Sequence, residues 1–492
     1  HDGKIEFRDA SRLWGKDAIE TQALLRDEIG DPEVQTLCIG QAGEKLVRFA
    51  CIRHGYKNTA GRTGMGAVMG AKNLKAVAVR GTQTIPVFDL ARYAPLRSEA
   101  NRELKTLTNA EVLHETGTAG GMNYAEYLGE MPARYFSQGT FPEVDNVSGG
   151  TMTNTILVGQ SACQGCVIAC GRVVRLDDGV KRKGPEYETI VGFGPNLLIS
   201  DLPAITGLGE QCDRLGMDSI SASNTIGLAF QLYDQGRLTV QDTGGLDLAW
   251  GSIEAVRALL PMIARREGIG DLLAEGSLRF GRHFHAEDQA VQVNGLEVAY
   301  HDPRGVSGMA LVYATSPRGA CHNQSDYFLI DWGEAKPSIG IPYIERHAGA
   351  EKAGNVARHQ DFRTVFNALT MCIFASVEPE AMVELVNAAC GLDWRLEELM
   401  AFGERGWNLK RLINNRMGLD GSADRLPARL LEPLAEGGAA GYIPDLGKML
   451  YAYYMERGWD LSTGRPTREK LAELGLEDLG PMPARTISGS ES

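Results

Sequence analysis

Several features that would place this chain in a simple class are missing from its sequence. Among its 492 residues no apolar run approaches the length of a membrane span. No basic run interrupts a formal net charge of −13, which argues against nucleic acid and against an anionic membrane surface as partners. There is no internal repeat and no low-complexity linker, so we expect closely packed domains. These absences favour a globular protein with small neutral or cationic partners.

A disulfide framework is also missing. The nine cysteines are an odd number in a long chain, which favours a reducing compartment and predicts a cytoplasmic location. The first residues do not read as a signal peptide, but the chain starts at His1 instead of an initiator Met. We therefore expect an N-terminal segment, which could carry a targeting signal, to lie outside this sequence.

Three of the cysteines are instead crowded into one short stretch, Cys163, Cys166 and Cys170, with C-x2-C-x3-C spacing. Thiolates at this spacing can converge on one iron–sulfur cube from a single loop. A structural zinc site would repeat the C-x2-C or add a close His pair, and a bacterial ferredoxin would add a further Cys and a Pro. The spacing predicts one cluster inside a larger enzyme, with a fourth ligand elsewhere. Three unmetallated core cysteines are the alternative.

A glycine-rich stretch at residues 60–75 contains Arg62, Gly64 and Lys75. Glycines can expose backbone N–H groups to a phosphate, and the two cations could add charge. The stretch lacks the G-K-[ST] of a P-loop and is not a G-x-G-x-x-G after a strand. A plain glycine-rich turn remains the alternative.

A second candidate site is the junction Asp213-x-x-Gly216-Met-Asp218. A carboxylate before a glycine turn can pair with the flat edge of a pterin or guanine ring. In isolation, an ordinary helix–glycine–helix corner is the favoured interpretation.

Periodicity predicts strands at 34–39, 46–52 and 76–79 with one helix at 16–28, followed by mostly helical sequence. Asp201 is the expected N-cap of a helix that Gly216 ends. The further elements expected are helices at 90–107, 219–235, 252–267, 270–283, 349–374, 379–390, 394–411 and 448–457, and a strand at 290–298. We expect disorder beyond Met482.

In this order and spacing, the motifs resemble the aldehyde:ferredoxin oxidoreductase family of tungsten enzymes. The matching stretches are the 60–75 loop, the cysteine loop, Gly184-Pro-Glu-Tyr-Glu188-Thr, the Asp213 junction, Asp302-Pro-Arg-Gly305, residues 314–322 and residues 464–475. Several ordered motifs are more specific than any one alone. The resemblance implies an α+β fold in three domains: 1–85, the later part of a β-rich pterin-binding domain; 86–290, helical with the cluster loop; and 291–492, helical with the fourth cluster cysteine.

The resemblance also implies roles for particular residues. Glu188 would exchange protons near tungsten. A structural glutamate on a strand, paired with an Arg, is the alternative. His322 would hydrogen-bond the substrate oxygen or an oxo ligand. Cys372 would be the fourth cluster ligand. Its motif departs from the family pattern, because Asn367 replaces a carboxylate and Thr370 a glycine. The implied cofactor-binding residues are Arg62, Gly64, Asp213, Gly216, Asp218, Asn367 and Met371.

The implied activity is oxidation of an aldehyde to a carboxylic acid. Electrons would pass through a 4Fe–4S cluster to a ferredoxin or ferredoxin-like subunit, within an oligomer or multi-subunit complex. The implied cofactors are the cluster and a tungsten or molybdenum bis-pterin, with Mg²⁺ bridging the pterin phosphates. The alternatives are a family relative that reduces aromatic acyl-coenzyme A thioesters and an electron-transfer subunit without pterin.

Overall fold

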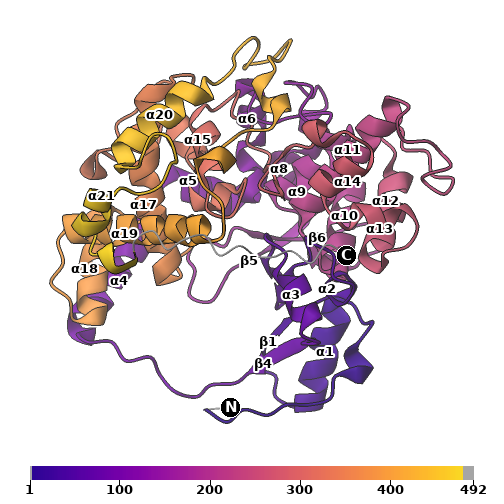
Figure 1. Ribbon diagram of the computed structural model, residues 1–492. Helices are drawn as coiled ribbons and strands as arrows, with labels where there is room; N and C mark the ends of the chain where they lie inside the picture. Colours follow the sequence, from indigo (N-terminus) through magenta and orange to yellow (C-terminus); the bar gives the residue numbers. More distant parts are fainter. Residues whose placement is uncertain (1–2, 480–492) are drawn as a thin grey trace. The chain divides into compact units, whose positions relative to one another are not determined.

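The computed structural model describes residues 3–479, in two compact units that each draw on separate stretches of chain (Figure 1). The first unit consists of His1–Ile85, Glu111–Tyr300 and Leu434–Ala440, and the second of Pro86–Ala110, His301–Pro433 and Gly441–Ser492. Helices combine with small antiparallel sheets, which confirms the α+β class. The division into three domains stays a prediction, and the expected disorder beyond Met482 lies outside the described residues.

The first unit begins with a four-stranded antiparallel sheet in the order β3-β2-β1-β4. Its elements are α1 (Ala18–Ile29), β1 (Gln35–Cys38), α2 (Gln41–Glu44), β2 (Ile52–His54), β3 (Asn58–Ala60), α3 (Met65–Ala71) and β4 (Ala76–Val79). The strand predicted over 46–52 is wrong. Leu46 has a φ of 57°, which breaks an extended chain, and Val47 and Phe49 are buried within turns.

A second sheet carries the cysteine loop, and the sequence did not predict it. It is the antiparallel series β5 (Leu157–Ser161), β6 (Gly171–Arg175) and β7 (Lys181–Lys183). The loop connects β5 to β6, so both of its ends are fixed by hydrogen-bonded strands. Strands this short leave little periodicity in a sequence, which is why this region was expected to be helical.

The rest of the first unit is helical. Its helices are α6 (Met122–Leu128), α7 (Val144–Val147), α8 (Gly149–Thr155), α9 (Tyr187–Phe193), α10 (Leu202–Leu215), α11 (Ser219–Asp234), α12 (Ile253–Arg265), α13 (Ile269–Leu273) and α14 (Ser277–His283). The Asp201 side chain caps α10, and Gly216 ends it with a φ of 80°, as predicted. The strand predicted over 290–298 is instead a two-stranded hairpin, β8 (Gln292–Val293) and β9 (Leu296–Glu297). Asn294 and Gly295 between them both have positive φ.

The second unit is built from helices. They are α4 (Leu90–Leu104), α15 (Gly308–Thr315), α16 (Phe328–Asp331), α17 (Ala353–Leu369), α18 (Pro379–Cys390), α19 (Leu396–Arg416), α20 (Leu446–Arg457) and α21 (Arg468–Glu473), while α5 (Thr108–Thr116) starts in this unit and continues into the first. Helix α17 packs against α19 and α20. Between them the buried Trp407 indole donates a hydrogen bond to Tyr453, at 3.0 Å, and Arg457 pairs with Asp361 at 2.6 Å.

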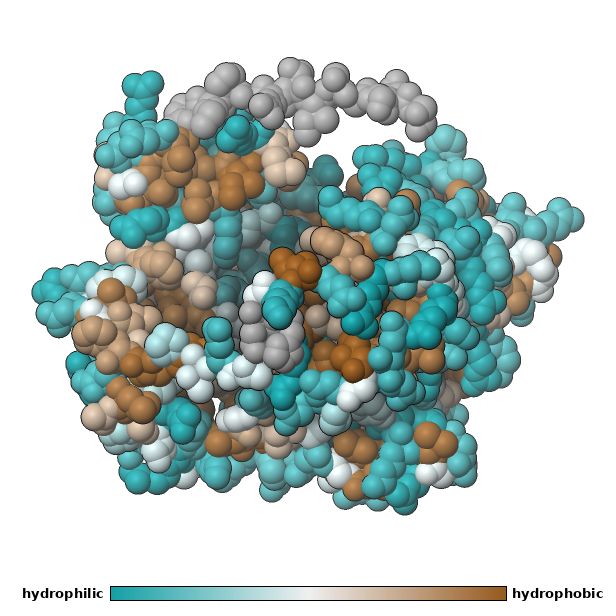
Figure 2. All heavy atoms as spheres, turned by 90° about the horizontal axis from the view of Figure 1, so that it is seen from below, coloured by the Kyte–Doolittle hydropathy of each residue, from teal (hydrophilic) through white to brown (hydrophobic). Residues whose placement is uncertain are grey.

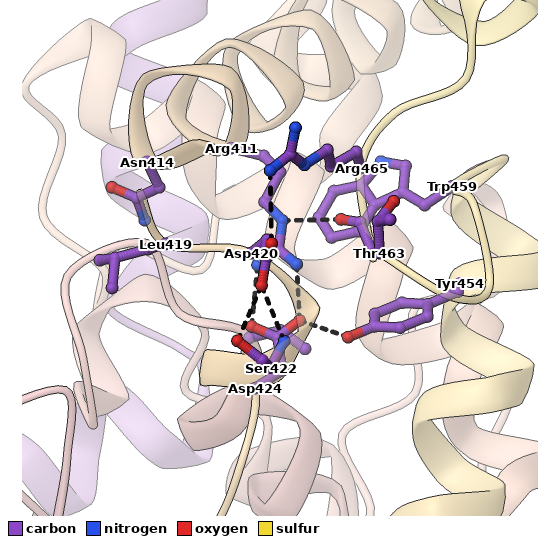
Figure 3. A network of polar contacts seen from close by, with 12 residues as sticks. Arg411, Asn414, Leu419, Asp420, Ser422, Asp424, Tyr454, Trp459, Thr463 and Arg465 are labelled. Carbon is purple, nitrogen blue, oxygen red and sulfur yellow. Dashed lines mark hydrogen bonds and ion pairs between the residues drawn. The ribbon is translucent and has the colours of Figure 1, made fainter. Parts of the chain in front are cut away.

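A polar network fixes the segments on both sides of α20 to α19 (Figure 3). The Arg411 guanidinium forms two 2.8 Å hydrogen bonds to Asp424 and donates another to the Gly464 carbonyl. The Tyr454 hydroxyl donates to the same Asp424 carboxylate. Because a buried carboxylate and guanidinium are costly unless fully hydrogen-bonded, this network specifies one path for the 420–465 segment.

Hydrophobic residues gather in patches among hydrophilic ones on the face shown in Figure 2. Among the residues that the structure describes, every helix is too short or too polar to cross a bilayer.

Candidate redox site

The cysteine loop curls back on itself between β5 and β6. The Cys166 amide donates to the Cys163 carbonyl at 3.1 Å, and Gly165 and Ala169 both have positive φ. Cys163 is exposed, and Cys166 and Cys170 are half-buried. The Ile168 amide donates a hydrogen bond to the Cys166 sulfur at 3.4 Å. The structure thus brings Cys163, Cys166 and Cys170 onto one loop, as their spacing predicts.

A buried arginine holds this loop in place. Arg172, in β6, donates to the carbonyls of Ala169 at 2.8 Å and Cys170 at 3.1 Å, and also to the carbonyls of His114 and Glu115 on α5. The side chain is 2% exposed, and burial lowers the pKa of its guanidinium. These contacts fix the backbone of the loop from Ala169 to Cys170 against α5.

No three His, Cys, Asp or Glu side chains between residues 3 and 479 are arranged to hold a single metal ion. A four-iron cube is larger than one ion, and each thiolate in it binds a different iron. Three thiols on one curled loop, with a backbone N–H directed at one sulfur, therefore fit a cluster better than a mononuclear metal.

The Asp213–Asp218 junction is held against the residues that precede β2 in the same unit. The Cys51 amide donates to the Gly216 carbonyl at 2.8 Å, and the Asp218 amide donates to the Phe49 carbonyl at 2.9 Å. A Cβ on Gly216 would lie 2.7 Å from the Gly40 nitrogen, so only glycine allows this close approach. The buried residues Phe49 and Cys51 thus position the junction.

Asp213 pairs with two cations that are distant in sequence. Arg53 lies 2.6 Å from one carboxylate oxygen and Lys183 3.0 Å from the other. Arg53 is 1% exposed, and its Nε has no hydrogen-bond acceptor within the described part of the chain. The site therefore offers both a carboxylate and a buried N–H donor, which suits a group with donor and acceptor atoms such as a pterin.

Asp218 has a structural role as well as its predicted one. Its side chain caps α11 through the Ile220 amide and accepts from Ser221 at 2.8 Å. The buried Arg62 lies 3.3 Å from the same carboxylate. The structure therefore brings Arg62 and Asp218 together, although they are 156 residues apart.

Gly64 and its neighbours are packed against backbone. A Cβ on Gly64 would lie 2.1 Å from the Arg48 carbonyl oxygen, and one on Gly70 would lie 1.8 Å from that of Gly43. Close packing of α3 against the preceding turns therefore explains these two glycines without a ligand. Their binding of a cofactor phosphate stays a prediction.

Glu188 lies on a helix, α9, and not on the strand considered as an alternative. One carboxylate oxygen accepts a hydrogen bond from the Tyr300 amide at 3.0 Å. The Tyr187 hydroxyl donates to the Tyr300 carbonyl at 2.8 Å. Side chains of α9 therefore hold both the amide and the carbonyl of Tyr300. Thr189 contacts Ser219, next to Asp218, through a 3.0 Å hydrogen bond between hydroxyls. Glu188 is thus positioned beside the Asp218 junction.

His322 starts a short 3-10 helix, His322–Gln324, in the second unit. Its ring lies 5.6 Å from that of His301, which stacks on Phe328 at 3.8 Å. Two residues further on, Gln324 accepts a 3.5 Å hydrogen bond from Lys410. Burial and the nearby Arg318 lower the pKa of Lys410 to about 8. Cys321 is buried, and its sulfur accepts a hydrogen bond from Arg318.

The second predicted cofactor motif follows the end of α17. Asn367 donates its amide back to the Arg363 carbonyl at 3.0 Å, and Thr370 ends the helix with a φ of 57°. Cys372 is exposed, while Met371 is half-buried. The helix predicted over 349–374 therefore ends sooner, which leaves Cys372 in a loop where a thiolate can reach a ligand.

Sequence reasoning missed three residues of this site: Arg53, Lys183 and Tyr300. Each of the three contacts a partner more than 25 residues away in the sequence. Tyr300 contacts Glu188 through its backbone amide, so no pattern of side chains in the sequence could have identified it. Within the first unit the structure groups Arg62, Asp213, Gly216, Asp218 and Glu188. Within the second unit, α17 contacts the turn that follows His322 through the Ser325–His359 hydrogen bond, and the Asn367–Cys372 segment covers the end of the same helix.

The sequence matches two family models over most of its length. Residues 1–81 match "Aldehyde ferredoxin oxidoreductase, N-terminal domain", and residues 96–476 match "Aldehyde ferredoxin oxidoreductase, domains 2 & 3".

Individual relatives are similar over nearly the whole chain. Tungsten-containing aldehyde ferredoxin oxidoreductases of Pyrococcus furiosus and Thermococcus kodakarensis are each 38% identical over 485 residues, covering 97% of this chain and 79% of theirs. The WOR-like subunit of an aliphatic sulfonate oxidoreductase from P. furiosus is 31% identical over 512 residues, covering 97% of this chain and 77% of its own.

One solved structure has a closely similar fold. It is the active-site complex BamBC of benzoyl coenzyme A reductase with 1,5-dienoyl-CoA, with a TM-score of 0.80 and 24% identity, covering 97% of this chain and 79% of that one.

Proposed function

Because the chain belongs to the aldehyde ferredoxin oxidoreductase family, whose members are oxidoreductases, we propose that it oxidises aldehydes to carboxylic acids with a tungsten pterin cofactor. In this reaction an aldehyde and water give an acid, two protons and two electrons. The bound cofactor and a 4Fe–4S cluster would supply the redox chemistry. The chain supplies positioning, proton transfer and the path for the electrons.

The observation that carries the proposal is the placement of Glu188. Its carboxylate is fixed by the Tyr300 amide on a helix that also contacts the Asp213–Asp218 junction through Thr189 and Ser219. A positioned carboxylate beside a cofactor site can take the proton that water loses as it adds to a carbonyl. His322, with a ring nitrogen that can donate or accept, would orient the substrate oxygen.

The cofactor would be held at two places. Asp213, Asp218, Gly216 and Arg62 would bind one pterin, with Gly64 near a phosphate and Mg²⁺ bridging the phosphates. Asn367 and Met371 would bind the other. Cys163, Cys166, Cys170 and Cys372 would ligate the cluster. The mixture of cations and carboxylates around Asp213 supports this assignment, because a pterin phosphate carries both hydrogen-bond donors and negative charge.

The electrons would pass from the cluster to a ferredoxin or ferredoxin-like subunit, in the cytoplasm and within an oligomer or multi-subunit complex. None of the nine cysteines in the described part of the chain forms a disulfide, which supports a reducing location.

The decisive experiment is viologen-linked oxidation of a panel of aldehydes by purified protein, combined with elemental analysis. We expect aldehyde turnover and both iron and tungsten in the protein. Turnover of an aryl-coenzyme A without aldehyde activity would replace the proposal with ring reduction. Iron without tungsten or molybdenum would indicate an electron-transfer subunit instead.

A further inference from the structure

Three surface cations lie around the cysteine loop in the first unit: Lys57, Arg175 and Lys181. Lys57 packs over the strand residue that follows Cys170, because a Cβ on Gly171 would lie 3.5 Å from the Lys57 Cδ. Its neighbour Asn58 lies 3.9 Å from the Cys163 sulfur. The turn between β2 and β3 is thus directly beside the loop.

Arg175 and Lys181 occupy directly opposite positions on β6 and β7. Like charges at such positions destabilise a sheet. Both side chains are exposed, and in the part of the chain that the structure describes neither forms an ion pair; nor does Lys57. Their neighbours do: Arg182 pairs with Asp178, and Lys183 with Asp213. An opposed pair of cations that the fold itself does not neutralise fits a surface that meets negative charge.

Two exposed apolar side chains complete this surface. Tyr56 is 47% exposed, and its hydroxyl donates to the Lys181 carbonyl, which joins the β2–β3 turn to the β6–β7 hairpin. Val180, next to Lys181, is 55% exposed. An aromatic and an aliphatic residue ringed by cations are typical of a protein interface. Asp177, at the tip of the hairpin, is the one acidic residue of this stretch without an ion pair in the described structure.

The surface charge elsewhere makes this patch selective. The chain carries a formal net charge of −13, so an acidic protein would be repelled over most of it. At physiological salt, screening limits this repulsion to about 8–10 Å. A local group of cations can therefore attract an acidic protein even though the chain as a whole is negative. Arg175 is four residues along β6 from Gly171, which is roughly 13 Å at a strand's rise per residue. The patch and the loop therefore fit within one interface of standard size.

We propose that Tyr56, Lys57, Arg175, Val180 and Lys181, beside the exposed Cys163, form the docking surface for a small acidic iron–sulfur protein that accepts the electrons. The inference rests on the proposed function, which supplies the electrons. Each aldehyde oxidised releases two electrons, so two one-electron acceptors are reduced in succession. In each step one electron would pass from the cluster held by the cysteine loop to the iron–sulfur centre of the acceptor.

The test is charge reversal in the intact holoenzyme, with Lys57→Glu, Arg175→Glu and Lys181→Glu combined. Lys45→Glu is the matched control, because Lys45 is an exposed lysine of the same unit at the end of α2. The apparent KM for an acidic ferredoxin should rise at least about tenfold in the triple variant and become nearly independent of salt. The control variant and the viologen-linked rate should be unchanged.

Binding of oxidised ferredoxin, measured by calorimetry at low and high salt, provides a readout that needs no aldehyde turnover. We expect the triple variant to lose the salt-sensitive binding of the unmodified protein, while a basic cytochrome c binds no worse. Equal ferredoxin affinity in both proteins would overturn the inference. Absence of viologen-linked aldehyde oxidation in the unmodified protein would instead count against the proposed function, so the two failures are distinguishable.

Discussion

The backbone N–H of Tyr300 donates a 3.0 Å hydrogen bond to the carboxylate of Glu188, 112 residues earlier in the chain. The contact joins α9 to the chain that follows the β8–β9 hairpin. The Tyr300 hydroxyl is itself fixed by Ser223 at 2.6 Å and Asn224 at 3.1 Å, and burial raises its pKa well above the usual value. A carboxylate held in this way has little freedom to turn, as proton transfer to a defined atom requires.

We expect Glu188→Gln to lower kcat for aldehyde oxidation at least about a hundredfold, because an amide cannot accept the proton. The hydrogen bond from Tyr300 can persist, so folding and tungsten content should be retained. Glu186→Gln is the control, since Glu186 lies two residues away and accepts a hydrogen bond from Thr118. Equal kcat values and pH profiles for the two variants would show that Glu188 is not the proton acceptor.

The cluster assignment predicts which cysteine substitutions lower the iron content. Cys163→Ser and Cys372→Ser should each lower the iron content and remove the electron paramagnetic resonance signal of the reduced cluster. Cys390→Ser, which changes another exposed free cysteine, should leave both intact. Full iron content in Cys372→Ser would exclude it as the fourth ligand.

Thr370 is strained where a glycine would not be. It ends α17 with a φ of 57°, and this left-handed conformation costs a residue with a branched Cβ about 1–2 kcal/mol. Thr370→Gly should therefore raise the free energy of unfolding by about 0.5–1 kcal/mol, after the entropy gained by the unfolded chain is subtracted. Urea denaturation measures the change.

The control for this change is Lys105→Gly at the end of α4, where φ is −68°. There glycine relieves no strain, and the variant should be neutral or less stable. A loss of stability in Thr370→Gly as large as in the control would show that the threonine side chain outweighs its backbone strain.

His359 should make the second unit sensitive to mild acid. The ring is 1% exposed and forms a 2.7 Å hydrogen bond with Ser325. Burial, and after it the positive charge of Arg363, lowers the pKa of His359 to about 3. The charge of Asp326 opposes this shift, and that of Lys336 adds to it. The folded state thus keeps His359 neutral, whereas the unfolded chain binds a proton below pH 6.5. The contribution of His359 to the free energy of unfolding is therefore fully present above pH 6.5. As the pH falls from 6.5 to 5, this contribution decreases by about 2 kcal/mol.

Replacing His359 with Gln should flatten this pH dependence in urea titrations, because Gln cannot be protonated and can still bond Ser325. His283→Gln, at the exposed end of α14, serves as the matched control. An unchanged slope in His359→Gln would assign the acid sensitivity to other groups.

The sequence predicted local features better than distant ones. The bounds of α18 follow from Pro379 in its first turn and Gly391 after its end, and both signals are local. The same is true of Asp201 and Gly216 at the ends of α10. By contrast, the apolar run at 46–52 suits an extended strand as well as it suits the observed turns, and only contacts with distant residues decide between the two. The hairpin within 290–298 was missed for another reason, because the Asn294–Gly295 turn is a local signal that the apolar pattern around it obscured.

For the candidate site, residue types could be predicted but their partners could not. The cysteine spacing identifies a loop, yet nothing nearby in sequence reveals that Arg172 fixes its carbonyls. Asp213 was expected to meet a ligand, but its pairing with Arg53 and Lys183 depends on how the sheet packs against α10. Charge neutralisation between distant segments is a property of the folded chain.

Helix α11 is buried along nearly its whole length, from Ile220 to Leu232. Its amide hydrogens can exchange with solvent only when the surrounding helices separate, so their protection should approach the free energy of global unfolding. Asp218, which caps this helix, therefore attaches the junction to the slowest-exchanging part of the first unit. The cysteine loop, with its exposed Cys163, should exchange far sooner, and deuterium uptake would place the two at opposite ends of the stability range.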